Sequence, residues 1–167
     1  MREVAWVQRI HSYEPIFRSD ARMLILGTMP SVKSLERGFY YAHERNAFWP
    51  IMARIFDVSV LETVEEKKAI MLTHQLALWD VAASCVREGS LDSNIRDCEP
   101  NDIYALMKQC PQIKRIVFNG AAARTLFLRY FRDLDVPGVR LPSTSPAYTL
   151  SFEEKYQAWR RIVKEET

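Results

Sequence analysis

Two segments near the start of the chain carry side chains that suit the binding of a flat, polar ring. The first, residues 27–31, reads Gly-Thr-Met-Pro-Ser and directly follows an apolar run. The second, residues 38–49, combines aromatic rings, an imidazole, a guanidinium and an amide. Aromatic faces stack on heterocycles, and an arginine can pair with a phosphate. Together these residue types predict a pocket for a nucleobase.

The turn at Gly27 could stabilise negative charge on a bound ring. Gly27 and Pro30 allow a sharp turn, which could aim the backbone amides of Thr28 and Met29 at an atom that gains charge. An ordinary connection between a strand and a helix would have the same sequence. Both interpretations stay open on the pattern alone.

The second segment offers several side chains, each with a structural alternative. Tyr41 and its neighbour Tyr40 could stack on a base, although such tyrosine pairs are more often core residues. Asn46 precedes an apolar helical pattern, so it could cap that helix or point its amide into the pocket. His43 could be an acid or a cation near phosphate, or a solvated loop residue, and Arg45 is the guanidinium compatible with phosphate.

Two later segments add amide and hydroxyl groups. Asn119 ends an apolar run, where it could form a turn or read the edge of a base with its acceptor and two donors. A stiff loop rich in hydroxyl groups follows the last apolar run, and it could grip a DNA backbone or simply lead the chain out of the sheet. Its residues are Ser143, Thr144, Ser145 and Pro146.

Other ways of working on a nucleotide lack their motifs. The chain has no P-loop, no dinucleotide-binding glycine pattern, no nucleophile elbow and no zinc-deaminase pattern. The cysteines Cys85, Cys98 and Cys110 are widely spaced and have no histidine at metal-ligand spacing, which predicts reduced thiols and no metal site. We therefore expect chemistry without a cofactor.

Composition limits the remaining classes. The 167 residues are 48% hydrophobic and 26% charged, which favours a single domain over residues 1–167. A net charge of +2 is too small to predict nucleic-acid binding by itself, so phosphate contacts would rest on local patches. Residues 1–20 have no apolar signal region, and no run of about 18 apolar residues occurs, which disfavours secretion and membrane insertion. We expect a cytoplasmic protein.

The elements that must position these residues alternate between short apolar runs and amphipathic stretches. Four apolar runs predict strands, and the first three are nearly continuous in apolar character, as is typical of strands covered on both faces. The runs are Met23–Leu26, Leu76–Trp79, Lys114–Phe118 and Val139–Leu141. The alternation favours a three-layer α/β domain with a parallel sheet.

Helices are predicted where apolar residues recur on one side of the chain. The three apolar stripes between the strands begin at Phe48, Ile103 and Ala122. The last helix opens with the capping box Ser151-x-x-Glu154. A further helix is predicted near Val4–His11, and Arg87–Pro100 is predicted to be a polar loop over the sheet edge.

The carboxyl ends of the predicted strands would bring the candidate residues together. Gly27 follows the first strand, Asp80 the second, Asn119 the third and the loop from Ser143 the fourth. Ligands of open α/β sheets bind at this edge. We therefore expect one cleft that is lined by all four strand ends.

In this order the motifs resemble the uracil-DNA glycosylase superfamily, and most closely its hypoxanthine (deoxyinosine) DNA glycosylase branch. The resemblance rests on residues 27–31, 39–49, 118–120 and 141–147 and spans roughly residues 22–165. It implies an α/β/α sandwich around a central, mostly parallel sheet of about four strands. It also implies an enzyme that flips a deaminated base out of damaged DNA and hydrolyses its N-glycosidic bond, which starts base excision repair.

The resemblance also implies roles for individual residues. Asn46, which follows the His-x-Arg segment, takes the position of the catalytic amide. Tyr41 takes that of the aromatic ring that stacks on the flipped base, and Asn119 that of the amide that contacts the base. Mismatch-specific relatives carry an Asn where this chain has Met29, so the role of that Asn is not transferred.

The remaining positions form the wall beside the base and the contacts with DNA. Those expected beside the base are Gly27, Thr28 and Met29, and those expected on the DNA are Ser31, His43, Arg45, Ser143, Thr144, Ser145 and Pro146. Our first hypothesis is a monomeric, monofunctional hypoxanthine glycosylase with uracil as a competing substrate. The alternatives are a uracil or broad deaminated-base glycosylase and a catalytically silent module that binds damaged DNA.

Overall fold

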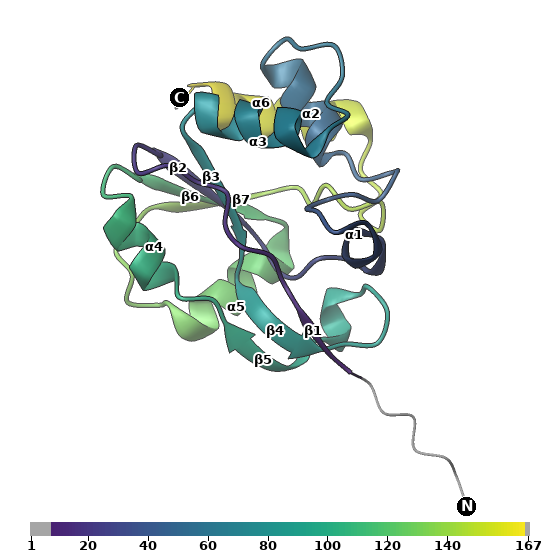
Figure 1. Cartoon of the computed structure of the whole chain (residues 1–167), viewed down its shortest axis with the longest axis vertical. Coiled ribbons are helices and arrows are strands. Elements are labelled where there is room, and N and C mark those ends of the chain that lie inside the picture. The colour runs from purple at the N-terminus through teal and green to yellow at the C-terminus, as the bar shows by residue number, and fades with distance from the viewer. Residues whose placement is uncertain (1–7, 166–167) are drawn as a thin grey trace, which may run out of the picture.

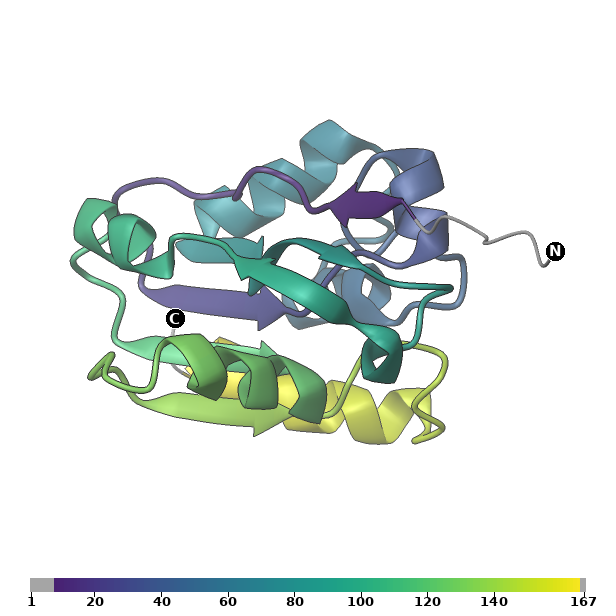
Figure 2. The same ribbon diagram turned by 90° about the horizontal axis from the view of Figure 1, so that it is seen from below.

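The computed structural model describes residues 8–165, and its centre is a parallel sheet of four strands in the order β3-β2-β6-β7 (Figures 1 and 2). These strands are β2 (Met23–Gly27), β3 (Leu76–Asp80), β6 (Arg115–Asn119) and β7 (Gly138–Leu141). Each lies where the apolar runs predict it, with its ends shifted by at most one residue. The predicted parallel sheet is therefore confirmed.

Strand β2 lies between β3 and β6, and all its residues are buried. Met23 and Ile25 belong to one hydrophobic cluster, and Leu24 and Leu26 belong to the other. Successive side chains of a strand point to opposite faces, so a run without polar residues requires a cover on each side.

Three helices cover the first face of the sheet, at the top of Figure 1: α2 (Phe48–Ile55), α3 (Val64–Thr73) and α6 (Phe152–Glu165). Phe48 and Trp159, both fully buried, meet edge to face with ring centroids 5.8 Å apart. The Trp159 indole N–H donates to the carbonyl of Pro142 at 2.8 Å, so α6 also holds the loop that leaves β7. The predicted capping box forms at Ser151 and Glu154.

Helices α4 (Ile103–Gln109) and α5 (Ala121–Tyr130) lie on the opposite face. Their buried residues join the second cluster, in which Phe127 of α5 packs on Phe118 of β6 with ring centroids 5.0 Å apart. Helices on both faces of one parallel sheet make the three-layer α/β/α sandwich that the sequence predicts.

A second, smaller sheet corrects two predictions. Strands β1 (Arg9–His11), β4 (Ala82–Val86) and β5 (Arg96–Pro100) pair antiparallel in the order β1-β4-β5. The stretch predicted as the loop Arg87–Pro100 thus contains β5 and the short 3₁₀ helix η1 (Asp92–Asn94). Strand β5 is mostly exposed, so its sequence has no apolar alternation that could reveal it.

The predicted helix near Val4–His11 is wrong over Gln8–His11, because Gln8 is not helical and Arg9–His11 form β1; Val4–Val7 lie outside the described residues. A strand of three residues is too short for periodicity to be visible, and β1 exists because β4 offers it an edge. Two helices also went unpredicted, α3 and the short α1 (Val32–Arg37).

The register of the large sheet sets its polar ends side by side. Gly27 pairs with Asp80, and Asn119 pairs with Leu141, so the chain segments that follow β2, β3, β6 and β7 all emerge at one edge. Within residues 8–165, none of the helices combines the length and apolar character needed to cross a bilayer.

Candidate active site

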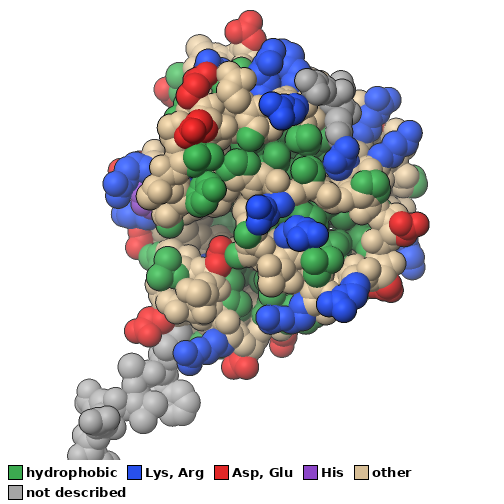
Figure 3. All heavy atoms as spheres, turned by 180° about the vertical axis from the view of Figure 1, so that it is seen from behind, with side chains coloured by type: hydrophobic (Ala, Val, Ile, Leu, Met, Phe, Trp, Pro, Cys, Tyr) green, Lys and Arg blue, Asp and Glu red, His purple; other side chains and the backbone are tan. Residues whose placement is uncertain are grey.

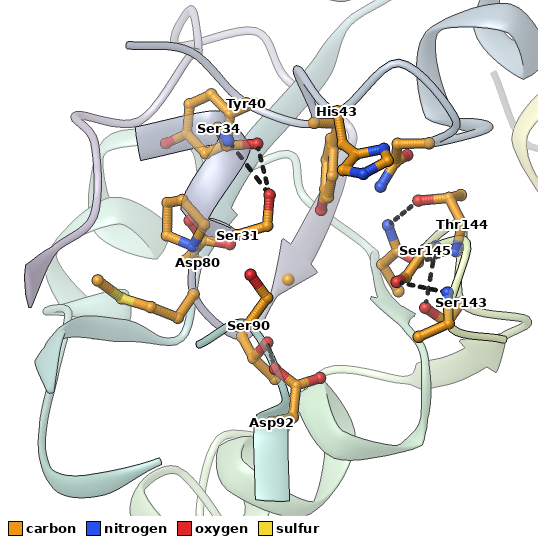
Figure 4. Close-up of a pocket in the computed structure, with 18 of the residues that line it drawn as sticks. Ser31, Ser34, Tyr40, His43, Asp80, Ser90, Asp92, Ser143, Thr144 and Ser145 are labelled. Carbon is orange, nitrogen blue, oxygen red and sulfur yellow. Dashed lines mark hydrogen bonds between the residues drawn. The ribbon is translucent and has the colours of Figure 1, made fainter. Parts of the chain in front are cut away.

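A pocket of about 240 Å³ opens at this edge of the sheet (Figure 4). Its wall contains twelve of the thirteen residues that the sequence singles out. They are Gly27, Thr28, Met29, Ser31, Tyr41, His43, Asn46, Asn119, Ser143, Thr144, Ser145 and Pro146. The thirteenth, Arg45, is exposed and lies outside the pocket wall, and its backbone N–H donates to His43 Nδ1 at 3.0 Å.

Gly27 lets two polar side chains approach the backbone of β2. A Cβ atom at this position would lie 2.6 Å from Asp80 Oδ1 and 2.8 Å from the Tyr41 hydroxyl oxygen. The following residue is also fixed, because the Thr28 hydroxyl donates to Asp92 Oδ1 at 2.6 Å. The turn after β2 is therefore built around close polar contacts rather than being a simple connection.

The two neighbouring tyrosines have different environments. Tyr40 is 2% exposed and donates its hydroxyl to the carbonyl of Glu14 at 2.7 Å, as the core alternative predicts. Tyr41 is partly exposed, has a φ of +52° and packs its ring 4.4 Å from that of Phe48. This left-handed backbone is uncommon for a residue with a side chain and costs roughly 1–3 kcal/mol, so surrounding contacts must hold it.

The hydroxyl of Tyr41 lies deep in the pocket wall. Its oxygen is buried and has no hydrogen-bond partner among the described residues. Burial, followed by the charge of Asp80, raises the pKa of Tyr41, while the Asn119 amide acts in the opposite direction. The hydroxyl is therefore protonated at neutral pH and is available as a hydrogen-bond donor.

Asn46 lies between the pocket and helix α2. Its Oδ1 accepts from the N–H of Phe48, the first residue of α2, at 2.9 Å, although the cap position itself is Ala47. The helix-capping interpretation is therefore nearly right, displaced by one residue. In the described part of the chain, Nδ2 of Asn46 has no partner, so this group can bind a ligand of the pocket.

The amide of Asn119 holds the loop that follows β7. Its Nδ2 donates to the Thr144 hydroxyl, and its Oδ1 accepts from the Thr144 N–H, both at 2.9 Å. The Thr144 carbonyl in turn accepts from the N–H of Ala47 at 3.0 Å, which joins the loop to the segment before α2. Asn119 therefore fixes one wall of the pocket with part of its hydrogen-bonding capacity.

This pair yields a stability prediction. Replacing Asn119 with alanine leaves the buried Thr144 N–H without its acceptor, so unfolding in urea is expected to show a loss of about 1–3 kcal/mol. Asn119→Ala combined with Thr144→Ala should cost less than the sum of the single changes, with a coupling of about 0.5–3 kcal/mol. Strict additivity would mean that the two side chains do not support each other.

Lys155 supports the Ser143–Pro146 loop of this wall from α6, and sequence reasoning missed it. It is 4% exposed on α6, and its ammonium donates to the carbonyl of Ser145 at 3.0 Å. Burial lowers the pKa of Lys155. The sequence does not indicate that Lys155 is buried, because a lysine in an amphipathic helix is normally solvated.

Two acidic residues also lie in the wall, and neither is assigned a role by the sequence. Asp80 ends β3 and is 2% exposed, and burial, followed by the charge of Asp92, raises its pKa to about 7. Asp92 lies at the exposed rim, and desolvation of its carboxyl end raises its pKa, whereas the bond from Thr28 acts in the opposite direction. In Figure 4, Asp80 lies toward Ser31, and Asp92 lies near Ser90.

The pocket wall has further members. Pro30, Tyr40 and Ala147 lie within the motif segments, whereas Ser34, Ser90 and Leu91 are marked by no sequence motif. Ser90 and Leu91 reach the pocket because the connection between β4 and β5 folds over the edge of the large sheet. A pattern within one segment cannot show this, because it depends on contacts between distant parts of the chain.

Comparison with known proteins agrees with this arrangement. A family model of the uracil DNA glycosylase superfamily matches residues 14–165. Two proteins named hypoxanthine DNA glycosylase, from Methanosarcina acetivorans and Methanosarcina barkeri, are 30% and 26% identical over 153 residues, which are 91% of this chain and 96% of each relative.

A solved structure extends the likeness to three dimensions. The solution NMR structure of a protein described as a uracil DNA glycosylase, from Methanosarcina acetivorans, superposes with a TM-score of 0.81 at 26% identity. The match covers 95% of this chain and 98% of that chain. The family match over nearly the whole length, together with the shared fold and the pocket at the strand ends, establishes that this chain belongs to the uracil DNA glycosylase superfamily.

Proposed function

We propose that this chain is a single-domain, monofunctional DNA glycosylase that removes hypoxanthine from DNA by hydrolysing the N-glycosidic bond. One observation carries the proposal: a pocket of about 240 Å³ unites an aromatic ring and two amide side chains, from Tyr41, Asn46 and Asn119, at the ligand-binding edge of the sheet. The similarity to proteins named hypoxanthine DNA glycosylase supports hypoxanthine as the base.

The residues of the pocket divide into those beside the base and those beside the sugar. The ring of Tyr41 stacks on the flipped base. The backbone amides of Thr28 and Met29 and the side-chain amide of Asn119 lie at the edge of that base. Asn46 holds the attacking water with its side-chain amide. Because the sugar becomes an oxocarbenium-like cation and the base becomes an anion, fixed donors and a positioned water supply the catalysis.

This reaction needs no covalent nucleophile. Lys33 lies near the first motif, but it is exposed on α1, and its ammonium is 3.6 Å from Glu36. The buried Lys155 donates to a backbone carbonyl of the loop from Ser143. We therefore expect no strand-cleaving lyase activity, and a covalent complex trapped by borohydride would contradict this expectation.

Base flipping contributes to selectivity before the base reaches the pocket. Extrusion costs a few kcal/mol, and the cost is lowest for a mispaired base, such as a mispaired inosine or uracil. The rim of the pocket, with Ser31, His43 and the Ser143–Pro146 loop, is the surface that holds the distorted DNA backbone. All of these residues come from one copy of the chain, so we expect the enzyme to act as a monomer.

The direct test uses end-labelled duplexes that carry one deoxyinosine or one deoxyuridine, with an undamaged duplex as the control. After incubation with the purified protein, hot alkali cuts the strand wherever a base has been removed. Scission at deoxyinosine is the expected result. Scission at deoxyuridine alone would move the chain to a uracil-specific branch, a second candidate that the description of the solved relative favours. Lesion binding without scission would favour a silent binding module.

DNA affinity supplies a separate prediction. Lys and Arg side chains are spread over the face shown in Figure 3, although the net charge is only +2. Affinity is expected to fall with salt, and Arg45→Ala is expected to reduce the slope of log K against log salt by about 1, the value for one lost phosphate contact. Arg161→Ala, which changes another exposed arginine, on α6, should leave the slope unchanged. Equal slopes for both variants would remove Arg45 from the DNA interface.

A further inference from the structure

The carboxyl group of Asp80 has an unusual place for an acidic side chain. It ends the strand next to β2, lies in the pocket wall and approaches Gly27, where a Cβ atom would be 2.6 Å from its Oδ1. Its Oδ2 is buried and finds no hydrogen-bond partner among the described residues. An unsatisfied buried oxygen is costly to the fold, and such groups in native proteins call for a functional explanation.

The groups that face Asp80 come from several elements. They are Tyr13 before β2, Tyr40 and Tyr41 after α1, Arg87 after β4 and Asp92 in η1. Arg87 is the cation of this set, and its charge acts to lower the pKa of Asp80, but its guanidinium donates to the carbonyls of Gly89, at 2.7 Å, and Pro30, at 2.5 Å. Burial and the charge of Asp92 disfavour the carboxylate, and the pKa of Asp80 rises to about 7.

We propose that Asp80 is a catalytic residue that enters the reaction as a carboxylic acid and donates its proton to a ring nitrogen of the leaving purine. This inference rests on the proposed function and names the group that neutralises the departing base. Asp92 is less suited to the task, because it lies at the exposed rim and its Oδ1 already accepts from Thr28 at 2.6 Å.

The step conserves atoms and charge. The bond between the sugar C1′ and the base nitrogen breaks, and its electron pair stays with the base. The Asp80 proton moves to a ring nitrogen, so the base leaves neutral and Asp80 becomes a carboxylate. Water bonds to C1′ and releases one proton to solvent, and Asp80 regains a proton from solvent before the next turnover.

Proton donation by Asp80 favours one class of leaving base over another. A purine carries lone pairs on ring nitrogens other than the one that is bonded to the sugar, and these nitrogens can accept the proton before or during bond cleavage. Uracil presents only carbonyl oxygens and an N–H group. An acid at the position of Asp80 therefore assists hypoxanthine more than uracil, which makes Asp80 a determinant of specificity as well as of rate.

The test measures single-turnover release of hypoxanthine, with enzyme in excess, between pH 5.5 and pH 9 for the wild type and Asp80→Asn. The wild-type rate should fall about tenfold per pH unit above roughly pH 7, because the acid form is lost. The amide of Asp80→Asn has similar size but no proton to transfer, so its rate should be about 10²-fold lower at pH 6 and free of this pH dependence. The same Asp80→Asn change should slow the release of uracil by a smaller factor than the release of hypoxanthine.

Several outcomes would overturn the assignment. A flat wild-type profile, or an Asp80→Asn variant as fast as the wild type at pH 6, would show that Asp80 transfers no proton. Loss of the pH dependence in Asp92→Asn but not in Asp80→Asn would assign the proton to the other acid. If the wild type released no hypoxanthine at any pH, the proposed function itself would fail, and with it this inference.

Stability measurements separate catalysis from folding. Because the folded-state pKa of Asp80 is raised, its contribution to stability is lost as the pH rises through about 7. Asp80→Asn has no carboxylate to bury, so its thermal midpoint at pH 8 should be at least that of the wild type. A slow variant with an intact midpoint would exclude misfolding as the cause, and the wild-type pH profile tests the proposal even if the variant does not fold.

Discussion

Replacing Asn46 with alanine is expected to slow release of hypoxanthine by about 10³-fold, while a duplex that carries the lesion still binds. The expected loss is large because Asn46 contributes its Nδ2 to the pocket and is the group that we propose to hold the attacking water. Single-turnover kinetics with enzyme in excess measures the chemical step, and fluorescence anisotropy of a labelled duplex measures binding.

The control for Asn46→Ala must account for its role at the start of α2. Loss of the bond from Oδ1 to the Phe48 N–H should cost about 1 kcal/mol of stability. Thr63→Ala removes a comparable bond, from the Thr63 hydroxyl to the Glu66 N–H at 3.1 Å, at the start of α3 and outside the pocket. If both variants were equally active, Asn46 would be a helix cap and nothing more.

Gly27→Ala is expected to reduce the rate of base release by roughly 10²-fold to 10³-fold, because small displacements at a reacting centre have effects of this order. The added Cβ would lie 2.6 Å from Asp80 Oδ1 and 2.8 Å from the Tyr41 hydroxyl, so both side chains must move. Overpacking of this kind should also lower stability by about 1–3 kcal/mol.

A second glycine provides the matched control. A Cβ atom at Gly138, at the start of β7 and away from the pocket, would lie 2.7 Å from Phe118 Cε2. Gly138→Ala should therefore lower stability by a similar amount, measured by denaturant unfolding, without slowing base release. Were Gly27→Ala to behave like Gly138→Ala in both assays, the close approach at Gly27 would serve packing alone.

The sequence by itself determined the large sheet and the identity of most pocket residues. Strand β2 is apolar throughout, and such a run can be stable only between two covering layers, so its place in a parallel sheet follows from hydrophobic burial. The polar residues that follow the apolar runs must then meet at one edge. For this reason the strand-end pattern predicts Gly27, Asp80 and Asn119 in one cleft, whereas Asn46 is placed there by the family resemblance.

The small sheet was beyond such reasoning. Strands β1 and β5 are largely exposed, and β1 has only three residues, so they carry no periodic apolar signal, and β1 was predicted as part of a helix. Their stability comes from backbone pairing with β4, which is a property of distant segments in contact. Ser90, Leu91 and Asp92 enter the pocket through this sheet, so their place in the wall could not be predicted either.

The chemistry of individual groups was also decided by the tertiary structure. Asp80 could be recognised as a strand end, but its raised pKa depends on near-complete burial and on Asp92, which lies in η1 between two strands of the small sheet. Likewise, the sequence shows that Asn119 has an amide, but only the folded structure shows that this amide forms hydrogen bonds with Thr144 in the pocket wall. Residue type sets what a side chain can do, and desolvation and neighbouring charges, which exist only in the folded chain, set what it does.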